Sequence, residues 1–123
     1  MKTDFFRFRD LLAVVLVAGA FATLALAHNK LMKTEPADGA VLKASPAHVE
    51  MWFAEKPDAA LSKISVKGPA GTVETGPARG TEKSLVADVK GTLADGKYTV
   101  SWQTSGDDGH VSKGEFGFSV QAH

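Results

Sequence analysis

The stretch that decides the fold reads Gly96-Lys97-Tyr98-Thr99-Val100-Ser101-Trp102-Gln103-Thr104. Three large side chains, Tyr98, Val100 and Trp102, alternate in it with smaller polar ones. Because successive side chains of a strand point to opposite faces, this period of two predicts a strand over 97–104 that is buried on one face. The Asp-Gly pair at 95–96 predicts a tight turn directly before it.

Six further stretches read as strands, at 29–34, 47–54, 62–67, 71–75, 83–89 and 113–120. Turn sequences such as Pro36-Ala37-Asp38-Gly39 separate them, and no long helical period appears. About seven short strands in one chain predict an all-β fold, an immunoglobulin-like Greek-key β-sandwich. The side chains expected in its core are Ala47, Val49, Met51, Phe53, Ile64, Val66, Leu85, Ala87, Val89, Tyr98, Val100, Trp102, Phe116, Phe118 and Val120.

The composition sets limits on function. The 123 residues are 44% hydrophobic and 23% charged, which suits one globular domain, and the formal net charge is zero. Acidic and basic residues are interspersed, so the composition favours neither nucleic acid nor an anionic membrane as a partner. The sequence has no cysteine, which excludes disulfides, thiolate metal sites and thiol catalysis.

Residues 1–27 resemble a Sec-type signal peptide. A basic start is followed by an apolar run from Leu11 to Leu26, which ends in the small-x-small pattern Ala25-Leu26-Ala27. We therefore expect cleavage after Ala27, export to the periplasm, and one domain over 28–123 without stable membrane insertion. The alternative is an uncleaved anchor, for which the run is short, because a membrane span needs about 20 residues.

Topology suggests which segments meet in space. If successive strands run in opposite directions, then His28, residues 55–58, residues 76–82 and residues 105–110 all lie at one end of the sandwich. Two of these segments carry metal-binding chemistry. Cleavage would give His28 a free α-amine beside its imidazole, and Asp108 and His110 lie two positions apart, so that in an extended segment both point to one side.

An amine nitrogen, two imidazoles and a carboxylate suit copper(II), which prefers nitrogen and oxygen ligands in a tetragonal plane. The amine, with a pKa of about 8 in model compounds, must lose its proton to bind, so copper affinity should fall on acidification. Each of these two segments also has an ordinary explanation that involves no metal. A histidine can follow a cleavage site by chance, and Asp-Gly-His is a good solvated turn.

The residues that carry this chemistry also carry a resemblance to the CopC/PcoC family of periplasmic copper-resistance proteins. The resemblance covers nearly all of the domain, and Glu55 matches a glutamate that lies near the metal in the family without being a ligand. One residue more than in the family separates Ser105 from Asp108, so Asp107 is the alternative to Asp108. The matching stretches are His28-x-Lys30-Leu31, Thr34-Glu35-Pro36-Ala37-Asp38-Gly39, Val49-Glu50-Met51-Trp52-Phe53-Ala54-Glu55, Gly96-Lys97-Tyr98-x-Val100-x-Trp102, Ser105-Gly106-Asp107-Asp108-Gly109-His110 and Gly114-x-Phe116-x-Phe118-x-Val120.

The resemblance implies copper(II) bound by His28, Asp108 and His110 in a monomeric, non-enzymatic carrier or buffer that serves copper resistance or homeostasis. It also implies delivery to an inner-membrane transporter of the CopD type. Some family members bind copper(I) through a methionine-rich loop and a histidine, but here that histidine position holds Trp52 and the loop over 56–70 lacks methionine. Two other classes stay open: a copper oxygenase with an N-terminal histidine brace, and a metal-free assembly module.

Three other residues are not assigned to the site. His48 is expected on the outer face of its strand, far from the ligand end. His123 is expected to fray. Trp52 shares the outer face with His48 and Glu50, where it either covers the sheet or forms a patch for a partner.

Overall fold

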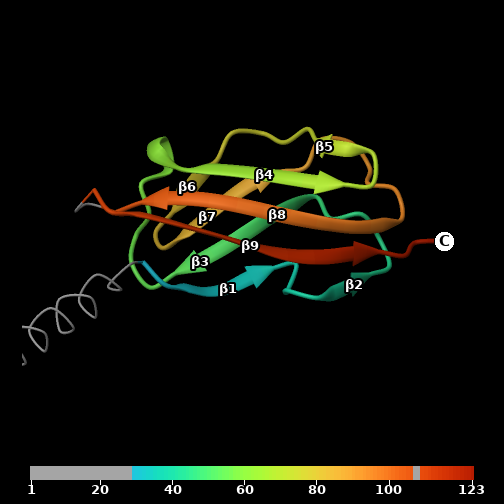
Figure 1. Cartoon of the computed structure of the whole chain (residues 1–123), viewed down its shortest axis with the longest axis horizontal. Helices are drawn as coiled ribbons and strands as arrows, with labels where there is room; N and C mark the ends of the chain where they lie inside the picture. Colours follow the sequence, from blue (N-terminus) through green and yellow to red (C-terminus); the bar gives the residue numbers. More distant parts are fainter. Residues whose placement is uncertain (1–28, 107–108) are drawn as a thin grey trace, which may run out of the picture.

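The computed structural model describes residues 29–106 and 109–123, which form two sheets packed face to face (Figure 1). One sheet has the strand order β1-β3-β7-β6, and the other has the order β2-β9-β8-β4-β5. A single 3-10 turn, η1, accompanies the strands within the described residues. The elements are β1 Leu31–Glu35, β2 Ala40–Leu42, β3 His48–Phe53, η1 Ala59–Leu61, β4 Lys63–Gly68, β5 Gly71–Val73, β6 Arg79–Thr81, β7 Ser84–Asp88, β8 Gly96–Ser105 and β9 Val111–Val120.

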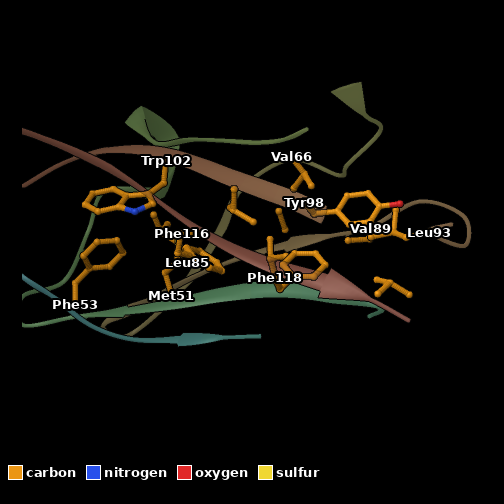
Figure 2. Packing of buried hydrophobic residues seen from close by; sticks show 14 residues of the cluster. Met51, Phe53, Val66, Leu85, Val89, Leu93, Tyr98, Trp102, Phe116 and Phe118 are labelled. Atoms are coloured by element: carbon orange, nitrogen blue, oxygen red, sulfur yellow. The ribbon is translucent and has the colours of Figure 1, made fainter. Parts of the chain in front are cut away.

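The immunoglobulin-like sandwich predicted from the alternating pattern is confirmed, and most of its core residues are the predicted ones, with Leu93 as an addition. In β8 every second residue is buried from Tyr98 to Trp102, and β3 and β9 alternate in the same way. Figure 2 shows these side chains meeting between the sheets. Of the expected core, Ile64 is only partly buried, and Ala47 is exposed because it precedes β3.

The described part of the chain forms nine strands, whereas the pattern predicts about seven. The two additional strands, β2 and β6, have three residues each, too few to show a period of two. β2 runs parallel to β9 at the edge of its sheet, and the amide of Gln121 donates to the carbonyl of Leu42 at 2.8 Å. β6 is exposed along its length and pairs only with β7.

The position of β6 shows that one expectation was wrong about the end of the sandwich where the metal ligands are predicted. Residues 76–82 do not form a loop at that end but run along the whole of β7. The Gly76 amide donates to the Asp88 carbonyl at 2.8 Å, at the end of β7, whereas Thr81 pairs with Ser84, at its start. Only the last residues of the segment therefore reach the end where the start of β1 lies.

The C-terminal residues are held rather than frayed, which is a second correction. The carboxylate of Asp95 accepts hydrogen bonds from the amides of Ala122 (2.9 Å) and His123 (3.1 Å). It also lies 3.3 Å from Nδ1 of His123. The hydrogen bond from the Ala122 amide is the main reason that the pKa of Asp95 lies below its ordinary value. Asp95, an acidic residue in the turn before β8, thus joins the residues that follow β9 to the start of β8.

Within residues 29–106 and 109–123, no helix has the length and apolar character needed to cross a membrane.

Candidate metal centre

Three segments distant in the sequence meet at one end of the sandwich, at the left of Figure 1: the start of β1, the loop after β3, and the connection from β8 to β9. Leu31 at the start of β1 pairs with Phe53 at the end of β3, which places the first two segments together. The amide of Asp58 donates to the carbonyl of Ser105 at 2.9 Å, which joins the loop to the end of β8. Of the segments expected at this end, the described residues therefore bring together 55–58, the part of 105–110 that is described, and the residues directly after His28.

Asn29 fixes the chain directly after the predicted ligand His28. Its Oδ1 accepts the amide of Glu55 at 2.8 Å, and its Nδ2 donates to the carbonyl of Glu55 at 2.8 Å. The amide of Ala54 donates to the carbonyl of Lys30, also at 2.8 Å. An asparagine side chain carries one acceptor and one donor, so it can pair with both polar groups of a single peptide residue. The start of the described chain is thereby held against the loop after β3.

Asp58 organises that loop and ties it to β8. Its Oδ1 accepts the amide of Ala60 and so caps η1, and its carbonyl accepts the hydroxyl of Ser62 at 2.6 Å. The Ser62 hydroxyl also lies 2.8 Å from that of Thr104, and both side chains are buried. A buried polar group is costly when it has no partner, so this pair favours one position of the loop against β8.

The connection between β8 and β9 closes tightly. Ser105 pairs with Val111, the amide of Gly106 donates to the His110 carbonyl at 3.2 Å, and the amide of Gly109 donates to the Gly106 carbonyl at 3.0 Å. Gly109 has a φ of 78°, a conformation that other residues adopt at a cost. His110 is exposed at this end, where an imidazole can reach a metal ion.

The predicted ligand set is described only in part. His28, Asp108 and the alternative Asp107 lie outside the described residues, so His110 is the one predicted ligand whose position is given. Among residues 29–106 and 109–123 no group of three or more His, Cys, Asp or Glu side chains is arranged to hold a metal ion. Glu55 is exposed, and its backbone is bonded to the neighbour of His28. The full set stays a prediction.

Aromatic rings fill the core below this end. Phe53 and Trp102 meet edge to face with ring centroids 5.1 Å apart, as Figure 2 shows. The Nε1 of Trp102 is buried and has no acceptor among the described residues. Gly114 lies opposite Trp102 in the sheet, and a Cβ added there would come within 2.8 Å of the indole. The absence of a side chain at Gly114 therefore makes room for the ring.

Sequence reasoning missed Asn29 and Asp58, although both types commonly bond to the backbone in loops and caps. Their partners depend on which loops meet, and that information comes only with the fold.

The residues that were not assigned to the metal site lie elsewhere. His48 pairs in register with Asp88 at the opposite end of β3, as predicted. Trp52 is partly buried, and the Lys33 ammonium lies 4.7 Å from its ring centroid.

Comparison with known proteins matches this chain to a family model described as the CopC domain, over residues 31–121. Copper resistance protein C of Xanthomonas campestris pv. juglandis is 32% identical over 127 residues, covering 94% of this chain and 99% of that protein. Protein YobA of Escherichia coli K12 is 33% identical over 99 residues, covering 77% of this chain and 80% of YobA.

Solved structures of other proteins have the same fold as this chain. The crystal structure of CopC from Methylosinus trichosporium OB3b superposes with a TM-score of 0.70 at 30% identity, covering 76% of this chain and 94% of that one. PcoC from Escherichia coli, a methionine-rich copper-resistance protein, superposes with a TM-score of 0.67 at 24% identity, covering 77% of this chain and 100% of that one.

Proposed function

Because the chain belongs to the CopC family of copper-resistance proteins, we propose that it binds copper(II) in the periplasm and carries or buffers it in copper resistance or homeostasis. One observation carries this proposal beyond family membership. The residue after His28 and the segment that flanks Asp108 are joined to the same loop, by the Asn29–Glu55 pair and by the Asp58–Ser105 hydrogen bond. Groups far apart in sequence are thereby kept at one end.

The proposed ligands are the α-amine and imidazole of His28, the carboxylate of Asp108 and the imidazole of His110. Asp107 is the alternative carboxylate, and Glu55 lies beside the copper without binding it. Nitrogen and oxygen donors of this kind suit copper(II). The position of Asn29 supports the set, because its two hydrogen bonds to Glu55 hold the start of the described chain, one residue after His28, against the loop that follows β3. Holding ligands in place before the metal arrives lowers the entropy lost on binding.

Processing is part of the proposal. Only cleavage after Ala27 gives His28 a free amine, since in the precursor the same nitrogen is an amide. The signal-like pattern of residues 1–27 supports this step. Removal of the leader thus creates the copper site as well as releasing the protein to the periplasm.

We assign a carrier or buffer role rather than catalysis. The relative that aligns with nearly the whole chain is named as a copper-resistance protein, and this supports binding over oxygenation. A monomer that passes copper to an inner-membrane transporter of the CopD type fits this role. Copper(II) is favoured over copper(I), because thioether ligands are few: Met51 is fully buried in the core, and Met32 stands alone on β1.

The test compares His110→Ala with His48→Ala in processed protein that begins at His28, using calorimetry and EPR with added copper(II). The proposal predicts one copper(II) per chain, a large loss of affinity in His110→Ala, and wild-type affinity in His48→Ala, because His48 lies at the opposite end. EPR should show fewer coupled nitrogens in His110→Ala. Equal losses in both variants would place the site elsewhere, and no binding by wild-type protein would leave a metal-free module.

A further inference from the structure

The outer face of the five-stranded sheet carries four exposed lysines: Lys63 and Lys67 on β4, Lys97 on β8 and Lys113 on β9. The pairing register puts them on one surface. Lys63, Gln103 and Lys113 form one row across the strands, Ser65, Ser101 and Glu115 the next, and Lys67 and Thr99 the third. In Figure 1 these three strands lie side by side on the near side.

Acidic groups are few on this surface, which we call the lysine face. Glu115 is the acid within the rows, and Asp38 flanks the face beside β9, where its carboxylate accepts the Gly117 amide at 3.0 Å. None of the ion pairs formed between described residues involves the four lysines. Their charges are therefore not neutralised by neighbours within the described chain.

The outer face of the other sheet is different. Arg79 there pairs with Asp88 at 2.8 Å, and Lys33 lies over Trp52. Glu50 lies between His48, 3.9 Å away, and the Ser84 hydroxyl, which donates to it. Because the cationic side chains named on this face have partners and the four lysines of the other face have none within the described chain, a chain of zero formal net charge has one side with unpaired positive charge.

The lysines are close enough to act together when the salt concentration is low. Lys63 and Lys67 are four positions apart on one strand, about 13 Å, and Lys63 and Lys113 lie two strands apart, about 10 Å. The Debye length at physiological ionic strength is about 8 Å. At physiological ionic strength the lysines are therefore largely screened from one another, and their potentials add strongly only at lower salt. Any binding through this face must therefore depend on salt.

The centre of the face exposes polar side chains above a buried ring. An open groove of about 470 Å³ lies between Lys63 and Lys113. It is lined by Ser65, Ser101, Gln103 and Glu115, and by Gly114 and the buried Trp102. Hydroxyl and amide groups of this kind can donate to phosphate oxygens. Of the exposed large apolar side chains described, Val111 at the start of β9 and Val41 on the edge strand β2 lie at the margins of the face, and Met32 and Leu61 lie on β1 and η1. Specific protein interfaces favour aromatic and apolar anchors at the centre and are depleted in lysine. The centre of this face exposes lysine, serine and glutamine side chains instead, which suits phosphate groups better than an acidic protein partner.

We propose that the lysine face binds the surface of an anionic phospholipid membrane, through attraction to lipid phosphates and without insertion. Each lysine near such a surface contributes about fivefold to the partition coefficient. Because the strands would then lie along the membrane, the end that holds His110 would stand beside the surface rather than be covered by it. The proposal is independent of copper.

The test measures binding of residues 28–123 to vesicles of phosphatidylglycerol and phosphatidylcholine, with pure phosphatidylcholine as the neutral comparison. The variant K63Q/K67Q/K97Q/K113Q removes the four positive charges of the lysine face. Its matched control, K30Q/K43Q/K56Q/K83Q, changes the net charge equally at four exposed lysines outside the face. Circular dichroism shows that each variant is folded. A further variant, Glu115→Gln, removes the acid from the face and should strengthen binding a few fold.

The proposal expects binding to the anionic vesicles that falls with added salt, a loss on the order of a hundredfold or more in the face variant, and a much smaller loss in the control. Inorganic phosphate at the same phosphate concentration should not compete, because a surface presents many phosphates at once. Equal losses in the two variants would overturn the proposal, as would competition by free phosphate or the absence of binding at low salt. In the last case an acidic protein would be the partner to test.

Discussion

Asn29 is the described residue that directly follows the predicted ligand His28. Two hydrogen bonds from one side chain to Glu55 fix the backbone immediately after the predicted ligand. Neither the sequence pattern nor the family resemblance indicated Asn29, because its partner is 26 positions away and becomes a neighbour only when β1 pairs with β3.

Replacing Asn29 with alanine should weaken copper(II) binding while leaving the fold intact. Hydrogen bonds contribute about 0.5–1.5 kcal/mol each, so the loss of two, about 1–3 kcal/mol, should lower affinity by about five- to 150-fold. Calorimetric titration with copper(II) measures this change in affinity. Ser45→Ala is the matched control, because Ser45 accepts the Leu93 amide away from the copper end. It should cost stability but not affinity, and an unchanged affinity in Asn29→Ala would show that the pair does not position the ligand.

Asp95 sets a pH dependence at the opposite end. Hydrogen bonds from Ala122 and His123 lower its pKa below the ordinary value of 3.8. A depressed pKa means that the stabilisation is fully present above 3.8 and is lost as the pH falls through the folded-state pKa. The amide signals of Ala122 and His123 should therefore move together in an NMR titration below pH 3.8. Asp95→Asn should remove that movement. Its persistence in the variant would assign the titration to another group.

Individual strands could be predicted in proportion to their length. β3, β8 and β9 have enough residues to show a period of two, and their inward side chains were identified correctly. β2 and β6 are three-residue edge strands whose pairing is decided by neighbours, β9 and β7. Local sequence carries little information about such pairings, so the position predicted for residues 76–82 was wrong.

Gly114 gives a prediction at the scale of the β8–β9 pair. A methyl group there would lie 2.8 Å from the Trp102 indole and 3.3 Å from its Nε1, so Gly114→Ala should destabilise the fold by about 1–3 kcal/mol. Gly76→Ala is the control, because its nearest contact would be an ordinary 3.7 Å. Urea unfolding followed by circular dichroism compares the two. Equal stability in both variants would mean that the indole shifts without cost.

At the scale of the molecule, the sandwich, its core and its family follow from the residues, whereas its charge asymmetry does not. Interspersed acidic and basic residues gave no sign of a cationic side, because strand register decides which face each residue joins. The same pairing gathers the start of β1, the loop after β3 and the β8–β9 connection at one end. The copper proposal adds one event to that geometry, the cleavage that frees the amine of His28.

A copper(II) titration of two proteins tests that proposal most directly: one begins at His28, and the other retains Ala27 in front of it. The amine is a ligand in the first and an amide in the second, so the account predicts that the added residue weakens binding by orders of magnitude. Equal affinity in the two proteins would contradict it.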